Sequence, residues 1–149
     1  MNDVSRMCSV DDIQLDVPAL NKHQLFEAAA RFLEQRHNMA AQTIVERLSE
    51  REALGSTALG QGVAVPHARV PGLQHAMVMF MRPRTPIPFD APDGKPVTDV
   101  LVLLIPDRAT DQHLQLLACA AEMFADRRFR DKLRACGQPE DVHRVFTHW

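Results

Sequence analysis

The chain has 149 residues, 46% of them hydrophobic and 24% charged, with a formal net charge of −2. This length and composition suit one globular domain with a real core and exclude a disordered chain. Basic and acidic residues are interspersed, so neither a nucleic-acid-binding surface nor a polybasic membrane-binding surface is expected.

A membrane segment and a disulfide framework are not expected either. The longest apolar stretch, Val100 to Ile105, is far too short to cross a bilayer. Met1 to Val10 lacks the apolar region of a signal peptide. The three cysteines, Cys8, Cys119 and Cys136, are unclustered, which is typical of a reducing compartment. We therefore expect a soluble, cytoplasmic protein.

Two amphipathic helices are predicted in the first part of the chain. Asn21 is a good N-cap, and apolar residues at helical spacing predict a helix from Lys22 to about His37. A second helix is predicted from about Ala40 to Ala53. Arg51 continues its apolar stripe at the helix end, so the stem can pack while the guanidinium reaches past the edge. No regular element is predicted in residues 1–20.

A glycine-containing loop and a short strand come next. Residues 55–62 contain three glycines and two hydroxyl side chains, and they are predicted to form a loop. Val63 to Val65 is typical of a short buried strand. Pro66 ends that strand because its ring fixes φ and removes a donor from the ladder. His67 is therefore expected where a core strand stops, on a backbone with little freedom.

The second half of the chain is predicted to hold two strands and three helices. The strands cover Gln74 to Met81 and Pro96 to Ile105, and a proline-rich structured loop or hairpin, Arg82 to Lys95, lies between them. The second strand contains a continuous apolar run that indicates a central strand. Helices are expected from Thr110-Asp111 to about Ala125, over Asp126 to Cys136, and from Gln138 onward. The first is expected to face the core with Leu114, Leu117, Ala118, Ala121 and Phe124. This order of elements predicts a single domain over residues 1–149, an α/β sandwich with a mixed β-sheet flanked by helices.

Two of the seven histidines stand apart by their positions. Taken singly, any histidine is more readily a surface or structural residue than a functional one. His67 follows the proline that ends the strand, whereas His113 lies in the first turn of a helix, where backbone amides favour an anion. Open α/β sheets bind ligands outside the ends of their strands, so these positions are compatible with one shared site.

Four separated segments give the sequence a family resemblance. They are Arg51-Glu52, Ser56-Thr57, Gly60-x-Gly62-Val63-Ala64-Val65-Pro66-His67 and His113-Leu114, supported by residues 88–97. In this order they resemble the IIA phosphocarrier domains of the bacterial phosphotransferase system, in the mannitol/fructose branch (EIIA type 2) that includes nitrogen-regulatory IIA. The resemblance covers roughly residues 10–147 and implies the α/β fold of that family. Ala58-Leu59 departs mildly from the glycine and aliphatic residue that are common there.

The resemblance also implies roles for the polar residues of these segments. His67 corresponds to the histidine that is phosphorylated at Nε2, His113 to a supporting histidine, and Arg51 to the arginine that stabilises the phosphoryl charge. The hydroxyl of Ser56 or Thr57 is expected to add a hydrogen bond to the phosphoryl group. These residue types suit the chemistry, because a neutral imidazole, favoured by a reference pKa of about 6.5, is the nucleophile, and transfer needs positioning and countercharge. The other ring nitrogen should donate to a backbone carbonyl.

The family implies a phosphohistidine carrier that is phosphorylated by HPr or by its nitrogen-branch paralogue NPr and that regulates partners according to its phosphorylation state. Potassium transporters and sensor kinases are the targets that the family suggests. Two alternatives stay open: a sugar-specific IIA component that passes the phosphoryl group to a IIB domain, and a regulatory binding module that is never phosphorylated. No cofactor or metal is expected, because the 55–62 loop lacks the Lys-Ser/Thr of a nucleotide-binding loop and no histidine or cysteine spacing indicates a metal site.

Overall fold

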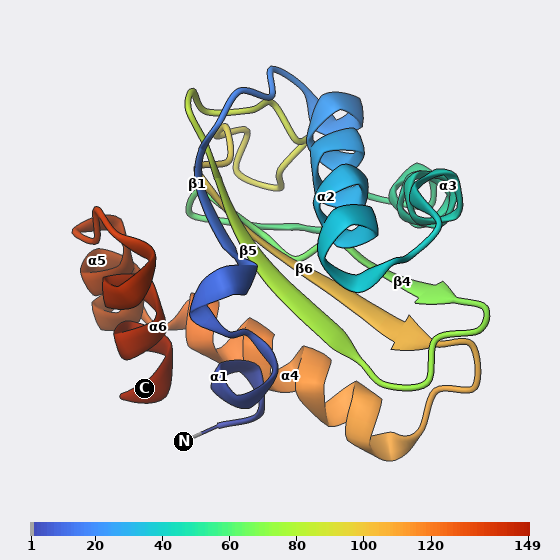
Figure 1. The fold of residues 1–149 in the computed structure, drawn as a ribbon. Helices are drawn as coiled ribbons and strands as arrows, with labels where there is room; N and C mark the ends of the chain where they lie inside the picture. Colours follow the sequence, from blue (N-terminus) through green and yellow to red (C-terminus); the bar gives the residue numbers. More distant parts are fainter. Residues whose placement is uncertain (1) are drawn as a thin grey trace.

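A mixed β-sheet lies between two layers of helices in the computed structural model, which describes residues 2–149 (Figure 1). The strands follow the order β1-β5-β6-β3-β2, and β4 also pairs with β6. Their bounds are β1 Ile13–Val17, β2 Ala58–Gly60, β3 Val63–Ala64, β4 His67–Val70, β5 Met77–Pro83 and β6 Asp99–Pro106. The helices are α1 Asp3–Met7, α2 Lys22–His37, α3 Ala41–Ala53, α4 Asp111–Ala125, α5 Arg127–Arg134 and α6 Pro139–Thr147, with a 3-10 turn at Val10–Asp12.

The sheet separates two hydrophobic cores. Helices α2 and α3 pack on one face, and α1, α4, α5 and α6 pack on the other. Strand β6 contributes to both cores, with Val100 and Val102 on the first face and Leu101 and Leu103 on the second. A strand that is buried on both faces carries a continuous apolar run rather than an alternating one. The expectation of a central strand here is confirmed.

The pairing directions confirm the mixed sheet and the α/β class. Strands β3 and β4 run parallel to β6, whereas β5 runs antiparallel to it. Strand β1 is parallel to β5, and β2 is antiparallel to β3. None of the helices within residues 2–149 has both the length and the apolar character that crossing a membrane requires.

Two stretches ahead of His67 differ from the sequence prediction. Residues 3–17 form α1, the 3-10 turn and β1, although no element was expected there, and Ile13 of β1 pairs with Phe80 of β5. Residues Ala58–Gly60 form β2, although the whole of 55–62 was expected to be a loop. Each of these elements has five residues or fewer, too few to show a periodicity of its own. Strand β1 becomes regular by pairing with the distant strand β5, and β2 by pairing with β3, which follows it after a short turn.

Helix α4 turns a different face to the core than its spacing suggested. The buried residues are Leu116, Ala120, Met123 and Phe124, so of the five expected core residues only Phe124 is fully buried. Apolar residues surround much of this helix, which leaves its rotation undetermined by local pattern. Because of the observed rotation, Leu114 is 58% exposed on the surface.

Candidate functional site

His67 is the first residue of β4 and lies beside the middle of β6. It pairs with Leu103, and the carbonyl of Pro66 accepts a hydrogen bond from the Leu103 amide at 2.9 Å. The amide of Val65 turns away and donates to the carbonyl of Thr57 at 3.0 Å. The first strand therefore ends before Pro66, as expected. His67, however, begins a second strand beside β6 instead of lying just beyond the end of the first.

The imidazole of His67 uses its two nitrogens in opposite ways. Nδ1 lies 2.9 Å from the carbonyl oxygen of Val65, and Nε2 lies 3.3 Å from Nε of Arg51. A carbonyl can only accept, so this network assigns the ring proton to Nδ1. An arginine can only donate, so Nε2 presents its lone pair. The prediction that the second nitrogen donates to a backbone carbonyl fits this geometry.

Arg51 reaches the histidine from the last turn of α3. Its Nη1 donates to the carbonyl of Gly55 at 2.8 Å, while its Nε points at His67. Two directional bonds on one planar guanidinium fix the plane as well as the position of the charge. A permanent cation therefore lies beside the lone pair on Nε2 of His67.

Glu52 fixes the loop that Arg51 touches. Its carboxylate accepts from the Thr57 hydroxyl at 2.7 Å and from the Thr57 amide at 3.1 Å, and it lies 2.9 Å from Nζ of Lys22. Only 7% of the Glu52 side chain is exposed. Lys22 continues the network to Asp90 at 3.2 Å. The sequence placed Glu52 beside Arg51, but nothing in it indicated that the partner of Glu52 is Thr57.

The hydroxyls of Ser56 and Thr57 already have partners inside the protein. Ser56 donates to the carbonyl of Phe89 at 2.5 Å, and Thr57, which is 5% exposed, donates to Glu52. A hydroxyl has one hydrogen to donate. Donation from either residue to a phosphoryl group would require its present bond to break, and the phosphate-binding role of both residues stays a prediction.

The turn between β2 and β3 is fixed by Asp93, from the proline-rich segment Arg82 to Lys95. Asp93 accepts from the Gln61 amide at 2.8 Å and from the Lys95 amide at 3.1 Å. These bonds, the one from Gln61 above all, hold the pKa of Asp93 below its usual value. Gly62 follows with φ at +80°, and a Cβ there would lie 3.0 Å from the Arg134 guanidinium. Glycine is therefore favoured where the chain enters β3.

His113 lies in the first turn of α4. Its Nδ1 accepts from the amide of Thr110 at 3.0 Å, which places the proton of a neutral ring on Nε2. Leu114 and Leu117, which follow it on the helix, line a cavity together with His67. His113 is not among the lining residues, and no hydrogen bond joins it to His67 within residues 2–149. Its supporting role stays a prediction.

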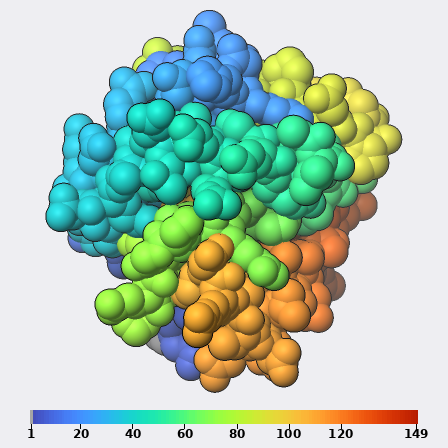
Figure 2. Space-filling model, turned by 90° about the vertical axis from the view of Figure 1, so that its right-hand side faces the viewer, coloured from blue at the N-terminus to red at the C-terminus, as the bar shows by residue number. Residues whose placement is uncertain are grey.

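The cavity beside His67 is open and has a volume of about 370 Å³. It is bordered by α3, β4, the end of β6 and the start of α4, which meet on one face of the molecule (Figure 2). Two leucines on its rim are unusually exposed, Leu54 at 85% and Leu114 at 58%. The lining residues are Arg47, Glu50, Arg51, Leu54, His67, Ala68, Arg69, Ile105, Leu114 and Leu117. A nucleophilic nitrogen, several cations and an apolar rim can together receive an anionic group from another protein.

Comparisons with known proteins agree on one family. The family model described as "Phosphoenolpyruvate-dependent sugar phosphotransferase system, EIIA 2" matches residues 6–149. The nitrogen regulatory protein of Pseudomonas aeruginosa is 38% identical over 132 residues, which cover 88% of this chain and 86% of that protein.

Solved structures show the same fold. The nitrogen regulatory protein IIA-Ntr of Neisseria meningitidis superposes with a TM-score of 0.90 at 39% identity, over 97% of this chain and 99% of that one. The mannitol IIA of Escherichia coli superposes with a TM-score of 0.75 at 19% identity, over 92% and 96% of the two chains. The second likeness concerns the fold alone.

Proposed function

Because the chain belongs to the EIIA 2 family of the phosphoenolpyruvate-dependent sugar phosphotransferase system, we propose that it carries a phosphoryl group on Nε2 of His67. HPr or NPr supplies that group, and the phosphorylation state of His67 regulates partner proteins. One observation carries the proposal: the His67 ring is held between the Val65 carbonyl and Arg51, with the lone pair of Nε2 directed at the cation.

The transfer step needs little covalent work from the protein. The Nε2 lone pair attacks phosphorus on the phosphohistidine of the donor and forms a new N–P bond. The donor's N–P bond breaks, and its electron pair returns to the donor's ring nitrogen. The Nδ1 proton stays on His67, bonded to the carbonyl of Val65. No proton has to leave the ring for the phosphoryl group to arrive.

Arg51 stabilises the arriving charge. It gives up its contact with Nε2 and turns to the phosphoryl oxygens, while its bond to the Gly55 carbonyl keeps it beside the histidine. One such charge pair at 4 Å is worth about 4 kcal/mol at an effective dielectric of 20. This magnitude steadies the phosphohistidine without trapping the phosphoryl group, as a relay requires.

The surface around His67 suits brief docking of a donor. Leu54 and Leu114 offer an apolar rim, and Arg47 and Arg69 add positive charge beside it. Transient complexes use small interfaces of this kind. Phosphorylation of His67 adds nearly two negative charges to the same face and so changes which partner it accepts. Potassium transporters and sensor kinases are candidate partners, and pull-downs with each phospho-form test them.

The test of the proposed function is phosphorylation in a reconstituted chain of phosphoenolpyruvate, enzyme I and either HPr or NPr. We expect acid-labile phosphate on the wild type and on His75→Ala, which alters an exposed histidine away from the cavity. His67→Ala should stay unlabelled. Labelling that survives His67→Ala rejects the histidine, and an unlabelled wild type favours a binding module that is never phosphorylated. Discharge by a IIB domain instead supports the sugar-specific alternative.

A further inference from the structure

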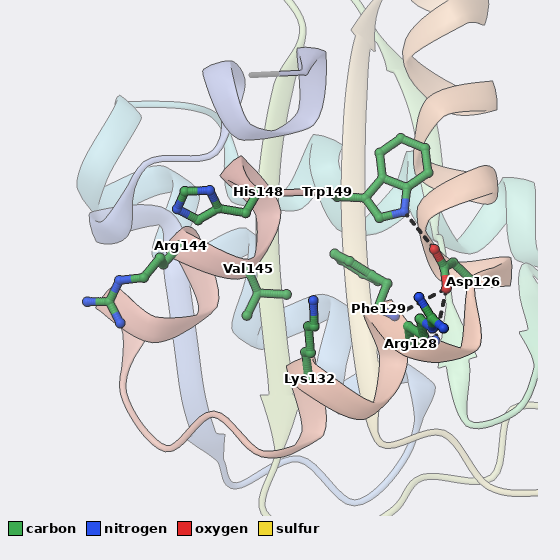
Figure 3. A pocket seen from close by; sticks show the side chains of 8 residues that line it. All are labelled: Asp126, Arg128, Phe129, Lys132, Arg144, Val145, His148 and Trp149. Atoms are coloured by element: carbon green, nitrogen blue, oxygen red, sulfur yellow. Dashed lines mark hydrogen bonds between the residues drawn. The ribbon is translucent and has the colours of Figure 1, made fainter.

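A second cavity, of about 790 Å³, lies between α5, α6 and the end of the chain (Figure 3). None of its lining residues lines the His67 cavity. The lining residues are Asp126, Arg128, Phe129, Lys132, Arg144, Val145, His148 and Trp149. Its size falls in the range of small-molecule sites, about 300–1,000 Å³.

The cavity has a fixed aromatic wall. Phe129 is 3% exposed, and its ring packs edge-on against Phe124 at 5.5 Å and stacks on Phe146 at 5.9 Å. Trp149 is 42% exposed on the rim, where its indole N–H donates to Asp126 at 3.3 Å. Flat rings that are already held in place offer an apolar surface at little conformational cost.

Two cations, Arg128 and Lys132, lie beside these aromatic rings. Arg128 and Lys132 are four residues apart on α5, so they lie on one face of the helix. Within residues 2–149, no carboxylate oxygen lies within 4.0 Å of either charged group. Figure 3 shows the Lys132 ammonium directed between Val145 and Phe129.

The one acidic side chain among the lining residues already has hydrogen-bond partners. Asp126 caps α5 and accepts from the Arg128 and Phe129 amides at 2.9 and 3.4 Å, as well as from the Trp149 indole. The bond from the Phe129 amide contributes most to holding the pKa of Asp126 below its usual value. Within the described residues Asp126 forms no ion pair with Arg128 or Lys132, so a ligand can pair with both cations.

We propose that this cavity binds a small aromatic anion, whose ring lies against Phe129 and Trp149 and whose phosphate, sulfonate or carboxylate group bridges Arg128 and Lys132. An uncharged ring would leave both cations unpaired, and an inorganic anion would leave the rings of Phe129 and Trp149 exposed to water. Both parts of the ligand are therefore needed. The site is independent of phosphorylation at His67.

Trp149 makes the test direct, because it is the one tryptophan of the chain. Its fluorescence is titrated with adenosine monophosphate and with benzenesulfonate, and with adenosine and inorganic phosphate as probes that each lack one part. We expect saturable changes with the two aromatic anions, at affinities about tenfold or more above those of the controls. Saturation by adenosine monophosphate alone would identify the ligand as a nucleoside phosphate. Adenosine that binds as tightly as its phosphate, or no saturation by either anion, overturns the proposal.

Matched variants locate the site. Lys132→Ala should weaken binding about fivefold, and the double variant with Arg128→Ala further. Arg31→Ala, which removes an exposed cation from α2, and His67→Ala should leave the affinity unchanged. Trp149→Phe keeps an aromatic ring on the rim, and amide chemical shifts then replace fluorescence as the readout. Shifts confined to residues 126–149 support the site, and shifts around β4 contradict it.

Discussion

The guanidinium of Arg51 joins His67 to the loop after α3, with Nε 3.3 Å from the Nε2 of His67 and Nη1 2.8 Å from the Gly55 carbonyl. Arg51, which contacts the lone pair of Nε2, is thus tethered by a second bond. If His67 carries the proposed phosphoryl group in place of the first bond, the second bond still holds the cation close to it. Arg51 therefore needs the shape of its side chain as well as its charge.

Arg51→Ala is expected to slow phosphoryl transfer to His67 about a hundredfold, as the loss of one positioned donor does at other sites. Arg51→Lys keeps the charge but loses the forked geometry, and it should lose on the order of tenfold. Rapid-quench transfer from phosphorylated HPr or NPr measures both rates. Arg47→Ala removes a cation one turn earlier that also lines the cavity, where it lies 3.9 Å from Glu50. An equal loss in Arg47→Ala would mean that only total charge matters.

Glu52→Gln is expected to loosen the loop that carries Gly55 and Thr57. It leaves Lys22 with one acidic partner instead of two and weakens the bonds to Thr57, so we expect a loss of about 2 kcal/mol in the free energy of unfolding. Transfer to His67 should also slow, by about fivefold, because Arg51 takes its tether from the same loop. Chemical denaturation and the transfer assay measure the two effects. Glu50→Gln changes an exposed neighbour, and a similar loss there would contradict the assignment to Glu52.

His113→Gln separates two roles of His113. Glutamine at the third helical position can still serve the Thr110 amide, so the helix start should keep its stability. The imidazole is lost, and we expect His67 to accept the phosphoryl group still but to exchange it about tenfold more slowly. Exchange kinetics with the donor measure this effect. Gln112→Ala in the same turn is the control, and unchanged exchange in His113→Gln would remove His113 from the mechanism.

Ser56→Ala and Thr57→Val test the phosphate-binding prediction against the contacts seen. Both hydroxyls donate inside the protein, to the Phe89 carbonyl and to Glu52. We expect each variant to lose about 1 kcal/mol of stability and to change the transfer rate less than Arg51→Lys does. A large loss of rate with unchanged stability would show instead that the hydroxyl turns to the phosphoryl group. Thr57→Ser keeps the hydroxyl and should behave as the wild type.

Asp12→Asn is expected to make stability less dependent on acid pH. Burial would raise the pKa of Asp12, but hydrogen bonds from Arg36, His37 and Ser9 outweigh it and hold the pKa below its usual value. A lowered pKa means that the wild-type carboxylate stabilises the fold above its unfolded pKa. That stabilisation is lost as the pH falls through the lower, folded pKa.

The free energy of unfolding should therefore differ by about 2 kcal/mol between the wild type and Asp12→Asn at pH 7. The difference should shrink as the pH falls below about 4. Urea denaturation across this range measures it. Asp11→Asn changes an exposed carboxylate 3.6 Å from Arg36 and should change stability by less than about 1 kcal/mol. A difference that stays constant with pH would contradict the assignment.

The sequence alone determined the elements that local pattern can specify. Periodic apolar residues predicted α2 and α3 within a residue or so of their observed bounds, and the apolar run of β6 indicated its central place. The four separated segments, taken in their order along the chain, indicated the family, which the comparisons confirmed. These features depend on neighbours in the chain, whose spacing is visible in one dimension.

Tertiary structure decided everything that depends on distant partners. Strand β1 forms because it pairs with the edge of β5. The rotation of α4 is set by the core that this helix covers, and it leaves Leu114 on the surface. Arg51 meets His67 only because α3 packs beside β4, and Trp149 closes its cavity only because the chain end returns to the cap of α5. The local sequence of such segments is compatible with several conformations, and the free energy of long-range packing selects one of them.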